Sequence, residues 1–395
     1  MSVGKSVNTK KYILQKIVRG SFMSNIAYAS NQGKLYFFNF SPWRMMQIES
    51  FFYAPNNQKF ICKTMDEALE KGLDNESNIF IYGIIEFPEV EEYAKEHNMT
   101  IYRIEDAFIR SVALGSGFAK PYSMGIDSRG IYFDPRRPSD LEYLLENYQF
   151  TDELISRAKR VRAEVVASKF SKYNHLEHAD IEIDREKYDK IILVTGQVED
   201  DMSIKFGAFG LNNSDLLQMV KERNPNSYII YKPHPDVLSG NRKGSIPKDI
   251  IESCTHEVQT LISIDSCIAV SDEIHTLTSG AGFDALIRGK KVHTYGMPFY
   301  AGWGLTTDYR KCERRTTVRS LDELVCATLI LFPRYISPKT GNFCEIEQTL
   351  RELKEEQEMY FANSLYRLKV NFKGYILPRG RKILRAILKP FNLKI

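Results

Sequence analysis

The stretch SYIIYKPHP, residues 227–235, places an apolar run before a lysine and a histidine that stands between two prolines. The apolar run is typical of a buried strand. Each proline fixes its φ angle and lacks a backbone donor, and the residue before a proline is pushed out of the helical region. We therefore expect a strand that ends in a stiff loop, with His234 held beside Lys232 as a site for an anion. A turn with a solvated imidazole explains this stretch equally well on its own.

Similar apolar runs recur along the whole chain, each followed by a turn and a helical pattern. Before residue 189, strands are predicted at 26–30, 34–40, 78–83 and 99–106, and helices at 64–73, 87–98, 138–150 (with Ser139 as N-cap) and 151–174. From residue 189 onward, strands are predicted at 189–197, 227–235, 267–273 and 291–296, helices at 214–225, 245–254 and 279–289, and a helical or mixed stretch at 258–266. This repeated alternation predicts the α/β class, with two Rossmann-like halves and a ligand cleft between them.

Composition and charge restrict the class of protein further. The chain has 395 residues, with 54 Lys/Arg and 50 Asp/Glu. The last 37 residues hold nine Lys/Arg and no Asp/Glu, so the remaining body is weakly acidic, which disfavours nucleic acid as a partner. No apolar run is long enough to predict a transmembrane helix, and MSVGKSVNTKKY lacks the core of a secretory signal. The six cysteines lack metal-type spacing, so reduced cytosolic thiols are expected.

The C-terminal part is predicted to be helical from about residue 321. In the segment CEIEQTLRELKEEQEMYF, residues 344–361, Ile346, Leu350 and Leu353 have helical spacing, so one face should rest on the body. The basic segment that follows, above all KILRAILKPF at 382–391, fits an amphipathic helix on an anionic membrane surface. Packing of this tail on the N-terminal half is the alternative.

A second anion-binding pattern lies in HTLTSGAGFDALIRGKKV, residues 275–292. Thr278 or Ser279 can cap the predicted helix, and Gly280 and Gly282 allow a ligand to approach the backbone closely. The free N–H groups and the helix dipole favour a phosphate there. Because a small-residue turn before a helix is common, this pattern gains weight only together with the KPHP loop at the same sheet edge.

An acidic loop follows the first strand of the second half. The sequence VTGQVEDDMSI, residues 194–204, has three successive carboxylates. Asp201 is our choice for a carboxylate that faces the anomeric carbon of a bound sugar, as nucleophile or base. A solvated turn is the alternative, above all for Glu199 and Asp200.

The first half contributes charged candidates as well. The sequence YRIEDAFIRSVALGSG, residues 102–117, ends a predicted strand with Glu105 and Asp106. Arg110 follows and can hold a carboxylate through two parallel hydrogen bonds. Asp127 is a candidate acid or base. Surface ion pairs explain each of these residues as well.

Five motifs resemble, in the same order, those of the β-Kdo transferases of the KpsC type, which act in capsule and O-antigen synthesis; Kdo is 3-deoxy-D-manno-oct-2-ulosonic acid. The motifs are EDAFIRSVALGSG, GIYFDPRRPSDLE, GQVEDD, KPHP and SGAGFDALIRGKKVHTYGMPFYAGWGLT, between about Ile101 and Pro333. The resemblance implies two Rossmann-like domains that face a central cleft, as in the GT-B class. It also implies transfer of β-Kdo from CMP-β-Kdo to a glycan with retention, by double displacement through a carboxylate nucleophile, without a metal or other cofactor.

The resemblance implies roles for individual residues and segments. Asp201 would be the nucleophile by its position in GQVEDD, with Asp200 as the alternative, and Asp127 and Glu105 would be the acid/base candidates. The CMP phosphate would be bound by His234, Lys232, Gln197, Ser279 and Gly280, and the Kdo carboxylate or the acceptor by Arg110 and Ser111. Residues 1–185 would form the acceptor-side domain with part of the active site, 186–335 the CMP-sugar-binding domain, and 336–395 the C-terminal helices and basic tail.

The sequence departs from the family pattern at two points, and two other functions remain as alternatives. Ala107 stands where a glycine is expected in an EDGF-like motif, and the chain has room for one module where KpsC proteins usually contain two, so one type of β-Kdo linkage is expected. The expected acceptor is a lipid-linked glycan, reached by a cytoplasmic enzyme peripheral to the inner membrane. A CMP-sialic acid transferase is the nearest alternative, and a non-catalytic nucleotide- or glycan-binding subunit is the other.

Overall fold

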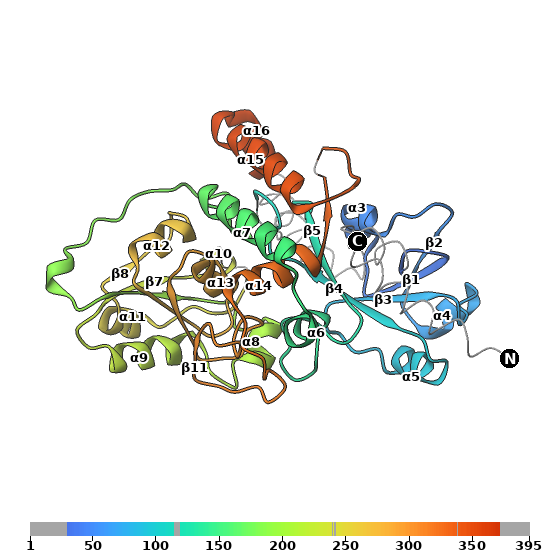
Figure 1. Cartoon of the computed structure of the whole chain (residues 1–395), viewed down its shortest axis with the longest axis horizontal. Coiled ribbons are helices and arrows are strands. Elements are labelled where there is room, and N and C mark those ends of the chain that lie inside the picture. The colour runs from blue at the N-terminus through green and yellow to red at the C-terminus, as the bar shows by residue number, and fades with distance from the viewer. Residues whose placement is uncertain (1–29, 114–118, 239, 241, 338, 372–395) are drawn as a thin grey trace, which may run out of the picture.

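Two α/β halves make up the described part of the protein. This computed structural model describes residues 30–113, 119–238, 240, 242–337 and 339–371. Figure 1 shows one half at each end of the long axis, and helices α6 (Asp140–Asn147), α7 (Asp152–Ala167) and α14 (Leu321–Val325) between them. The predicted α/β class with two Rossmann-like halves is confirmed.

The first sheet has seven strands in the order β13-β12-β5-β4-β3-β1-β2. Strands β2, β1, β3 and β4 are parallel, whereas β5, β12 and β13 are antiparallel to their neighbours. The continuous apolar run of β1 is fully buried, as expected for a parallel strand covered on both faces. The strands are β1 (Lys34–Phe38), β2 (Gln58–Cys62), β3 (Asn78–Tyr82), β4 (Ile101–Asp106), β5 (Ser123–Asp127), β12 (Pro333–Ile336) and β13 (Phe343–Cys344).

The second sheet has six strands in the order β11-β10-β9-β6-β7-β8, and all of its pairings are parallel. All five residues of β6 are buried, which again matches an uninterrupted apolar run. The strands are β6 (Ile191–Thr195), β7 (Tyr228–Lys232), β8 (Glu257–Val258), β9 (Glu273–Thr276), β10 (Lys291–Thr294) and β11 (Thr307–Asp308).

Helices connect and cover these strands. Beside the first sheet are α3 (Pro42–Ile48), α4 (Met65–Glu70) and α5 (Pro88–Glu96), with a short 3-10 helix η1 (Glu49–Phe52). Around the second sheet are α8 (Met202–Gly207), α9 (Asn213–Arg223), α10 (Pro235–Leu238), α11 (Lys248–Cys254), α12 (Ile264–Val270) and α13 (Gly280–Ile287), preceded by η3 (Arg185–Lys187). A π-helical turn, η4 (Cys326–Leu331), continues α14, and α15 (Ile346–Ala362) and α16 (Ser364–Asn371) follow β13.

Most predicted elements are present, but the strand predicted at 267–273 is wrong. These residues belong largely to α12, because the Ser263 hydroxyl accepts a hydrogen bond from the Ser266 N–H and caps a helix. Cys267 and Ile268 are buried on that helix. A short apolar run fits a buried helix as well as a strand, and the true strand, β9, starts at Glu273. Strands β2, β5 and β11 and helices α3, α8 and α10 had no prediction. Strands β12 and β13 show that the part after residue 321 is not wholly helical, which differs from the prediction.

The C-terminal predictions have different outcomes. Ile346, Leu350 and Leu353 are buried on α15, so the predicted contact of this helix with the body is confirmed. The predicted strand at 26–30 lies almost wholly outside the described residues, as does the basic tail segment at 382–391. The domain boundaries at 185 and 335 stay predictions; β12, which contains residue 335, and β13 both lie in the first sheet. None of the described helices combines the length and apolar character that crossing a bilayer requires.

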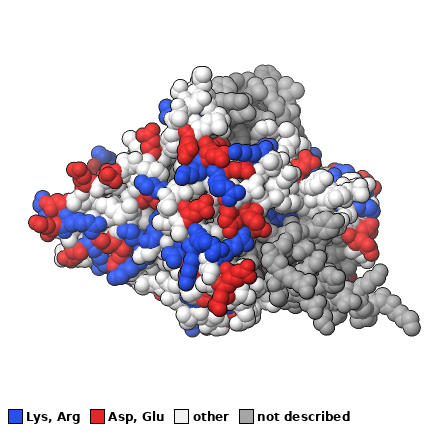
Figure 2. All heavy atoms as spheres, turned by 45° about the horizontal axis from the view of Figure 1, so that its top comes forward, with Lys and Arg blue, Asp and Glu red and all other residues white. Residues whose placement is uncertain are grey.

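Charged side chains join the two halves. Glu142 of α6 accepts from Arg314 Nε at 2.7 Å and from Arg315 Nε at 3.1 Å, and both it and Arg315 are buried. Arg315 Nη1 also donates to the carbonyl oxygens of Pro298 and Ala301. This cluster therefore fastens a helix of the first half to the loop after β10. Elsewhere, Figure 2 shows basic and acidic side chains interspersed on the displayed face.

We expect Glu142→Gln to lower the free energy of unfolding by about 3 kcal/mol, because breaking a buried pair leaves two guanidinium groups without their carboxylate. Denaturant unfolding of the full chain measures this change. Glu252→Gln is the control, since its pair with Lys248 on α11 is exposed and should contribute little. Equal stability of the two variants would contradict the proposed importance of the Glu142 cluster.

Candidate active site

A cavity of about 1130 Å³ is lined by residues from both sheets. One wall follows the ends of β1, β3 and β4, and the other follows the ends of β6, β7 and β9. Because these strands are parallel within their sheets, their carboxyl ends share one edge of each sheet. Ligands of open α/β sheets bind at this edge. The predicted cleft is therefore present, and it has contributions from both halves.

Gly196 allows the loops after β6 and β7 to lie against each other. Its N–H donates to the carbonyl oxygen of Lys232 at 2.8 Å. A Cβ at position 196 would lie 2.3 Å from the Tyr231 hydroxyl and 3.1 Å from Pro233 Cα, so any side chain would displace the KPHP loop. The glycine of GQVEDD therefore brings the acidic loop and the histidine loop together.

His234 lines the cavity, and a hydrogen bond from the backbone determines which of its ring nitrogens carries the proton. Its Nδ1 accepts a hydrogen bond from the Asp236 N–H at 3.1 Å. A neutral imidazole that accepts at Nδ1 carries its proton on Nε2. Burial lowers the pKa of His234, and the carboxylates of Asp236 and Asp201 only partly oppose this effect. At neutral pH the side chain is therefore a neutral donor through Nε2.

Asp201 lines the same cavity and is half-buried. It is the N-cap of α8, where Oδ1 accepts from both the N–H and the hydroxyl of Ser203, at 2.9 and 2.7 Å. These two bonds orient the carboxylate, and among the described residues no hydrogen bond occupies Oδ2. Asp200, in contrast, is not part of the cavity lining and forms an ion pair with Arg242 at 3.0 Å. The geometry thus favours Asp201 over Asp200 as the residue that faces a ligand.

The start of α13 forms another part of the wall. The Ser279 hydroxyl caps the helix by accepting from the Ala281 N–H at 3.2 Å. A Cβ on Gly280 would meet no atom within 4 Å, so the helix N-terminus is open to the cavity at this residue. Gly282 differs, because a Cβ there would lie 2.1 Å from the Tyr300 hydroxyl. The expectation of ligand access at Gly282 is wrong, and this glycine is needed for packing.

Two predicted phosphate ligands use their polar groups to hold neighbouring loops. Lys232 lines the cavity, and its Nζ donates to the Ile262 carbonyl oxygen at 2.6 Å. The side-chain amide of Gln197 makes two hydrogen bonds with Thr278, since its Oε1 accepts from the N–H at 2.8 Å and its Nε2 donates to the hydroxyl at 2.9 Å. Both residues therefore position the walls, and their contact with a phosphate stays a prediction.

Glu105 and Arg110 bring charge to the opposite wall. Burial raises the pKa of Glu105 to about 7, and the adjacent Asp106 carboxylate contributes to the rise. Arg110 is only 4% exposed. Its Nε donates to Asp106, and its Nη1 donates to the Ser111 hydroxyl and to the Ala119 carbonyl oxygen. Because its Nε and Nη1 donate to these protein atoms, Arg110 mainly holds the loop after β4 in place.

Asp127 and Ser111 are not among the residues that line the cavity. Asp127 pairs with Arg103 of β4 in the antiparallel ladder. Arg103 lies two residues before Glu105, so this pair is away from the carboxyl end of β4. Its Oδ1 accepts from three backbone N–H groups, each at 3.0 Å, in the loop that leads to α6. The Ser111 hydroxyl donates to the Ala113 carbonyl oxygen. Both residues hold loops through these hydrogen bonds, and the acid/base role of Asp127 stays a prediction.

Lys172 and Asp284 are cavity residues that the sequence reasoning missed. Lys172 falls within the helix predicted at 151–174, but α7 ends at Ala167, and Lys169 then adopts a positive φ of 56° that turns the chain toward the cavity. Asp284 lies one turn into α13, and burial raises its pKa to about 7. The only available signal for Asp284 was a carboxylate within the otherwise apolar run GFDALI.

The paired sheets and the cavity at their carboxyl edges place the protein in the class of two-domain, GT-B-like α/β folds. Comparison with known proteins gives the family. Residues 88–335 match the family described as "Capsule polysaccharide biosynthesis protein", and the chain belongs to this family.

Curated relatives agree with this assignment. The capsule polysaccharide modification protein LipA of Neisseria meningitidis serogroup A is 41% identical over 336 residues, covering 84% of this chain and 47% of that protein. The lipopolysaccharide-processing protein LpsZ of Rhizobium meliloti is 41% identical over 280 residues, covering 70% of this chain and 63% of that protein. The chain thus spans about half the length of the LipA proteins that it matches.

Two solved structures are similar over most of the chain. Thermosulfurimonas dismutans KpsC, β-Kdo 2,7 transferase, is 34% identical with a TM-score of 0.65, covering 82% of this chain and 99% of that one. The β-Kdo 2,4 transferase of the same KpsC is 29% identical with a TM-score of 0.68, covering 80% and 97%. These matches confirm the resemblance that the five sequence motifs indicated.

The raised pKa of Glu105 predicts a pH-dependent stability. The folded protein favours the protonated form of the Glu105 carboxyl. This preference stabilises the fold at pH values below the ordinary pKa of 4.5, and the stabilisation is lost as pH rises through about 7. Glutamine cannot ionise, so Glu105→Gln should not lose this stabilisation. The melting temperature of the variant should therefore rise relative to that of the wild type between about pH 5 and about pH 8. Glu92→Gln, on the exposed face of α5, should show no such trend. Parallel pH profiles for wild type and Glu105→Gln would contradict the assignment.

Proposed function

We propose that this chain is a glycosyltransferase that moves β-Kdo from CMP-β-Kdo to a glycan acceptor with retention of configuration, in the synthesis of capsule polysaccharide or a related surface glycan. One observation carries the proposal: the Asp201 carboxylate and the His234 imidazole line the same wall of one cavity, close enough to interact electrostatically. The identity of 34% to a solved β-Kdo transferase supports the choice of sugar.

In the first step, Asp201 acts as the nucleophile. Its carboxylate oxygen forms a bond to C2 of Kdo, while the bond from C2 to the phosphate oxygen of CMP breaks and CMP takes the electron pair. The hydrogen bonds from Ser203 to Oδ1 hold the carboxylate in one orientation. Such positioning lowers the barrier because the reacting atoms are held together before reaction.

CMP leaves with an additional negative charge, and the residues of the second sheet stabilise it. His234 donates from Nε2 to the phosphate, since its Nδ1 is occupied by the Asp236 N–H. The open N-terminus of α13 at Ser279 and Gly280 provides backbone N–H groups and a favourable dipole. Preorganised donors of this kind stabilise the transition state more than the bound substrate. Transfer proposed in this way uses no divalent cation.

In the second step, Glu105 acts as the general base. Its carboxylate takes the proton of an acceptor hydroxyl, whose oxygen then bonds to C2 and releases Asp201. A pKa of about 7 suits this exchange at neutral pH. Two successive displacements at C2 retain the β configuration. The role falls to Glu105 because Asp127 lies outside the cavity lining.

Lys172 is the residue best placed to bind the carboxylate of Kdo. It lines the cavity, and among the described residues it makes no hydrogen bond or ion pair. Burial opposes its charge, but the phenols and carboxylates around it, Tyr132 first, raise the pKa of Lys172 above its ordinary value. A charged ammonium without a protein partner is suited to an anionic ligand group. Arg110, in contrast, already donates to Asp106.

The acceptor lies on the side of the first sheet in this proposal. The cavity extends there along Asn39, Tyr82 and Gly83, at the ends of β1 and β3. We propose a lipid-linked glycan as the acceptor, with the basic segment after residue 363 holding the enzyme at the anionic cytoplasmic surface of the inner membrane.

The proposal predicts that Asp201→Asn reduces transfer from CMP-Kdo by at least about a thousandfold, because the amide cannot form the glycosyl adduct. The assay uses CMP-Kdo generated in situ with a panel of lipid-linked glycans, and calorimetry measures CMP binding separately. CMP binding should survive, and Asp200→Asn, the neighbouring control, should retain transfer. Turnover of CMP-sialic acid but not CMP-Kdo would replace the donor, and full activity of Asp201→Asn would overturn the mechanism.

A second prediction separates the sugar from the nucleotide. Lys172→Met should raise the KM for CMP-Kdo by about 10- to 100-fold, since a hydrogen bond to a charged group contributes about 1.5–3 kcal/mol. Inhibition by free CMP, which lacks the sugar carboxylate, should stay unchanged. Lys205→Met, on the exposed side of α8, is the matched control and should alter neither quantity. A parallel loss of affinity for CMP would instead place Lys172 at the phosphate.

A further inference from the structure

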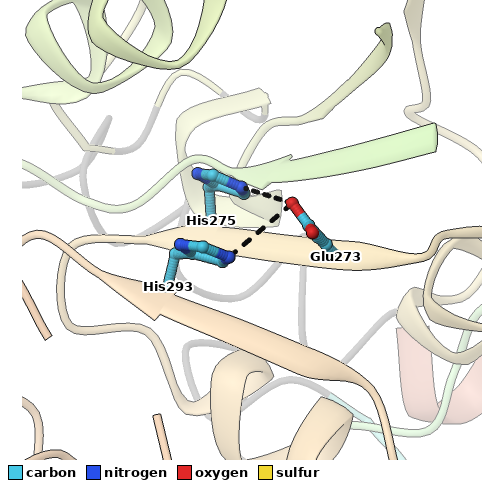
Figure 3. Close-up of side chains that lie close together, drawn as sticks. All are labelled: Glu273, His275 and His293. Atoms are coloured by element: carbon cyan, nitrogen blue, oxygen red, sulfur yellow. Dashed lines mark ion pairs between the residues drawn. The ribbon is translucent and has the colours of Figure 1, made fainter. Parts of the chain in front are cut away.

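A cluster of three metal-ligating side chains lies on the second sheet, outside the residues that line the cavity. His275 of β9 and His293 of β10 are direct partners in the parallel ladder, and Glu273 lies two residues before His275, on the same face. Figure 3 shows both imidazoles beside the Glu273 carboxylate, with one ring above the other. The rings stack with centroids 4.3 Å apart. The proposed transfer reaction gives this cluster no role.

The separations in this cluster do not fit direct hydrogen bonds. Glu273 Oε2 lies 3.6 Å from His275 Nε2 and 3.6 Å from His293 Nε2. A distance of about 3.6 Å is too long for a hydrogen bond. Neighbouring ligand atoms around a tetrahedral zinc ion lie roughly 3.4 Å apart, because each is about 2.1 Å from the metal. All three ligand atoms lie within 4.8 Å of one another. Because the two ring planes are nearly parallel, at 5°, at least one imidazole has to turn before both Nε2 lone pairs point at the same ion.

The inner nitrogen of His275 has an unsatisfied environment. This side chain is only 2% exposed, and its Nε2 has no hydrogen-bond partner. A buried polar atom of this kind is costly unless something binds it.

The outer nitrogens of both rings are next to tyrosine hydroxyls. His275 Nδ1 lies 3.1 Å from the Tyr295 oxygen, and His293 Nδ1 lies 3.5 Å from the Tyr309 oxygen. Histidines that bind a metal through one nitrogen usually donate from the other to a fixed acceptor, which orients the ring. Tyr295 and Tyr309 are placed to accept those N–H groups, which would leave both Nε2 atoms for one ligand.

Lys190 supplies the positive charge that Glu273 needs in this structure. Its Nζ lies 2.8 Å from the same oxygen, Glu273 Oε2, that faces the two histidines. The lysine side chain is 31% exposed, so it can move into solvent without becoming a buried charge. A divalent cation at the cluster would take over the neutralisation of Glu273, and Lys190 would compete with it.

We propose that Glu273, His275 and His293 form a binding site for a divalent transition metal, with Zn²⁺ as the best match to two imidazoles and one carboxylate. The metal would link β9 to β10. The loops after these strands carry Thr278 and Phe299 into the cavity wall, so the site stabilises the scaffold of the active site without contacting the substrate. This inference is independent of the proposed transferase activity.

The test is metal binding by the full chain, purified with a chelator and then dialysed. Calorimetry with Zn²⁺ should show one site per chain, and Zn²⁺ should raise the melting temperature. Co²⁺ should give the visible absorption of a four-coordinate N/O site. His293→Gln should weaken Zn²⁺ binding by about tenfold or more, with Glu273→Gln as the second variant if the first does not fold. Lys190→Met should strengthen binding, because it removes the competing ammonium.

Two results would overturn the proposal. One is unchanged Zn²⁺ affinity in both His293→Gln and Glu273→Gln, which would place the metal elsewhere, for example at His234. The other is a loss of affinity in Lys190→Met, which would show that the cluster is a closed ion-pair network. His97→Gln, at the end of α5 in the other half, is the matched control for nonspecific histidine binding and should bind Zn²⁺ as the wild type does.

Discussion

The whole site depends on the rule that parallel strands present their carboxyl ends at one edge of the sheet. Strands β6, β7 and β9 lie side by side, so the loops after them must meet, although 81 residues separate Gln197 from Thr278. Close contact between the first two loops requires the missing side chain of Gly196. The hydrogen bonds between Gln197 and Thr278 then fix the third loop. The loop that carries Asp201, the loop that carries His234 and the N-terminus of α13 therefore form one wall.

Burial of ionisable side chains in the cavity shifts their pKa values. In the cavity, burial raises the pKa of Glu105 and of Asp284 to about 7 and lowers that of His234. Only the two carboxyl groups are shifted toward pH 7, where a carboxyl group can take up and release a proton, whereas the shift of His234 favours its neutral form. The shifts work against stability, because a carboxylate that is costly to ionise weakens the folded state as pH rises. Such groups are found where function requires them more often than elsewhere.

The two halves have to stay in register for the opposite walls to act together. Strand β12 returns the chain to the first sheet after the second sheet is complete, and it pairs with β5. Ion pairs add further links: Arg157 of α7 contacts Glu347 of α15, and Arg162 contacts Asp322 of α14. In Figure 1 these helices lie between the halves or above the joint. The Glu273 cluster would add to this scaffold within the second half.

Several features of the fold could be predicted from local pattern. Apolar runs identified β1, β3, β6 and β7 because buried parallel strands have no polar face, and Ser139 was recognisable as the cap of α6. The same kind of run failed at 267–273, where a capped helix buries its apolar residues equally well. Local pattern also indicated that Asp201, His234 and Ser279 lie at the ligand edge of the sheet, because each follows a strand or begins a helix, and all three line the cavity.

By itself, the sequence determined the class of fold, most of its buried parallel strands and the loops that carry the candidate groups, since these follow from spacing and backbone preference. Only the tertiary structure decided which of those groups face the cavity. It excluded Asp127 from the lining, engaged Arg110 with Asp106 and added Lys172 and Asp284. It also placed His275 beside His293, across two strands. The physical reason is that the burial and the partners of a side chain depend on how distant segments of the chain pack together. The residue spacing within one segment contains no information about which other segment packs against it.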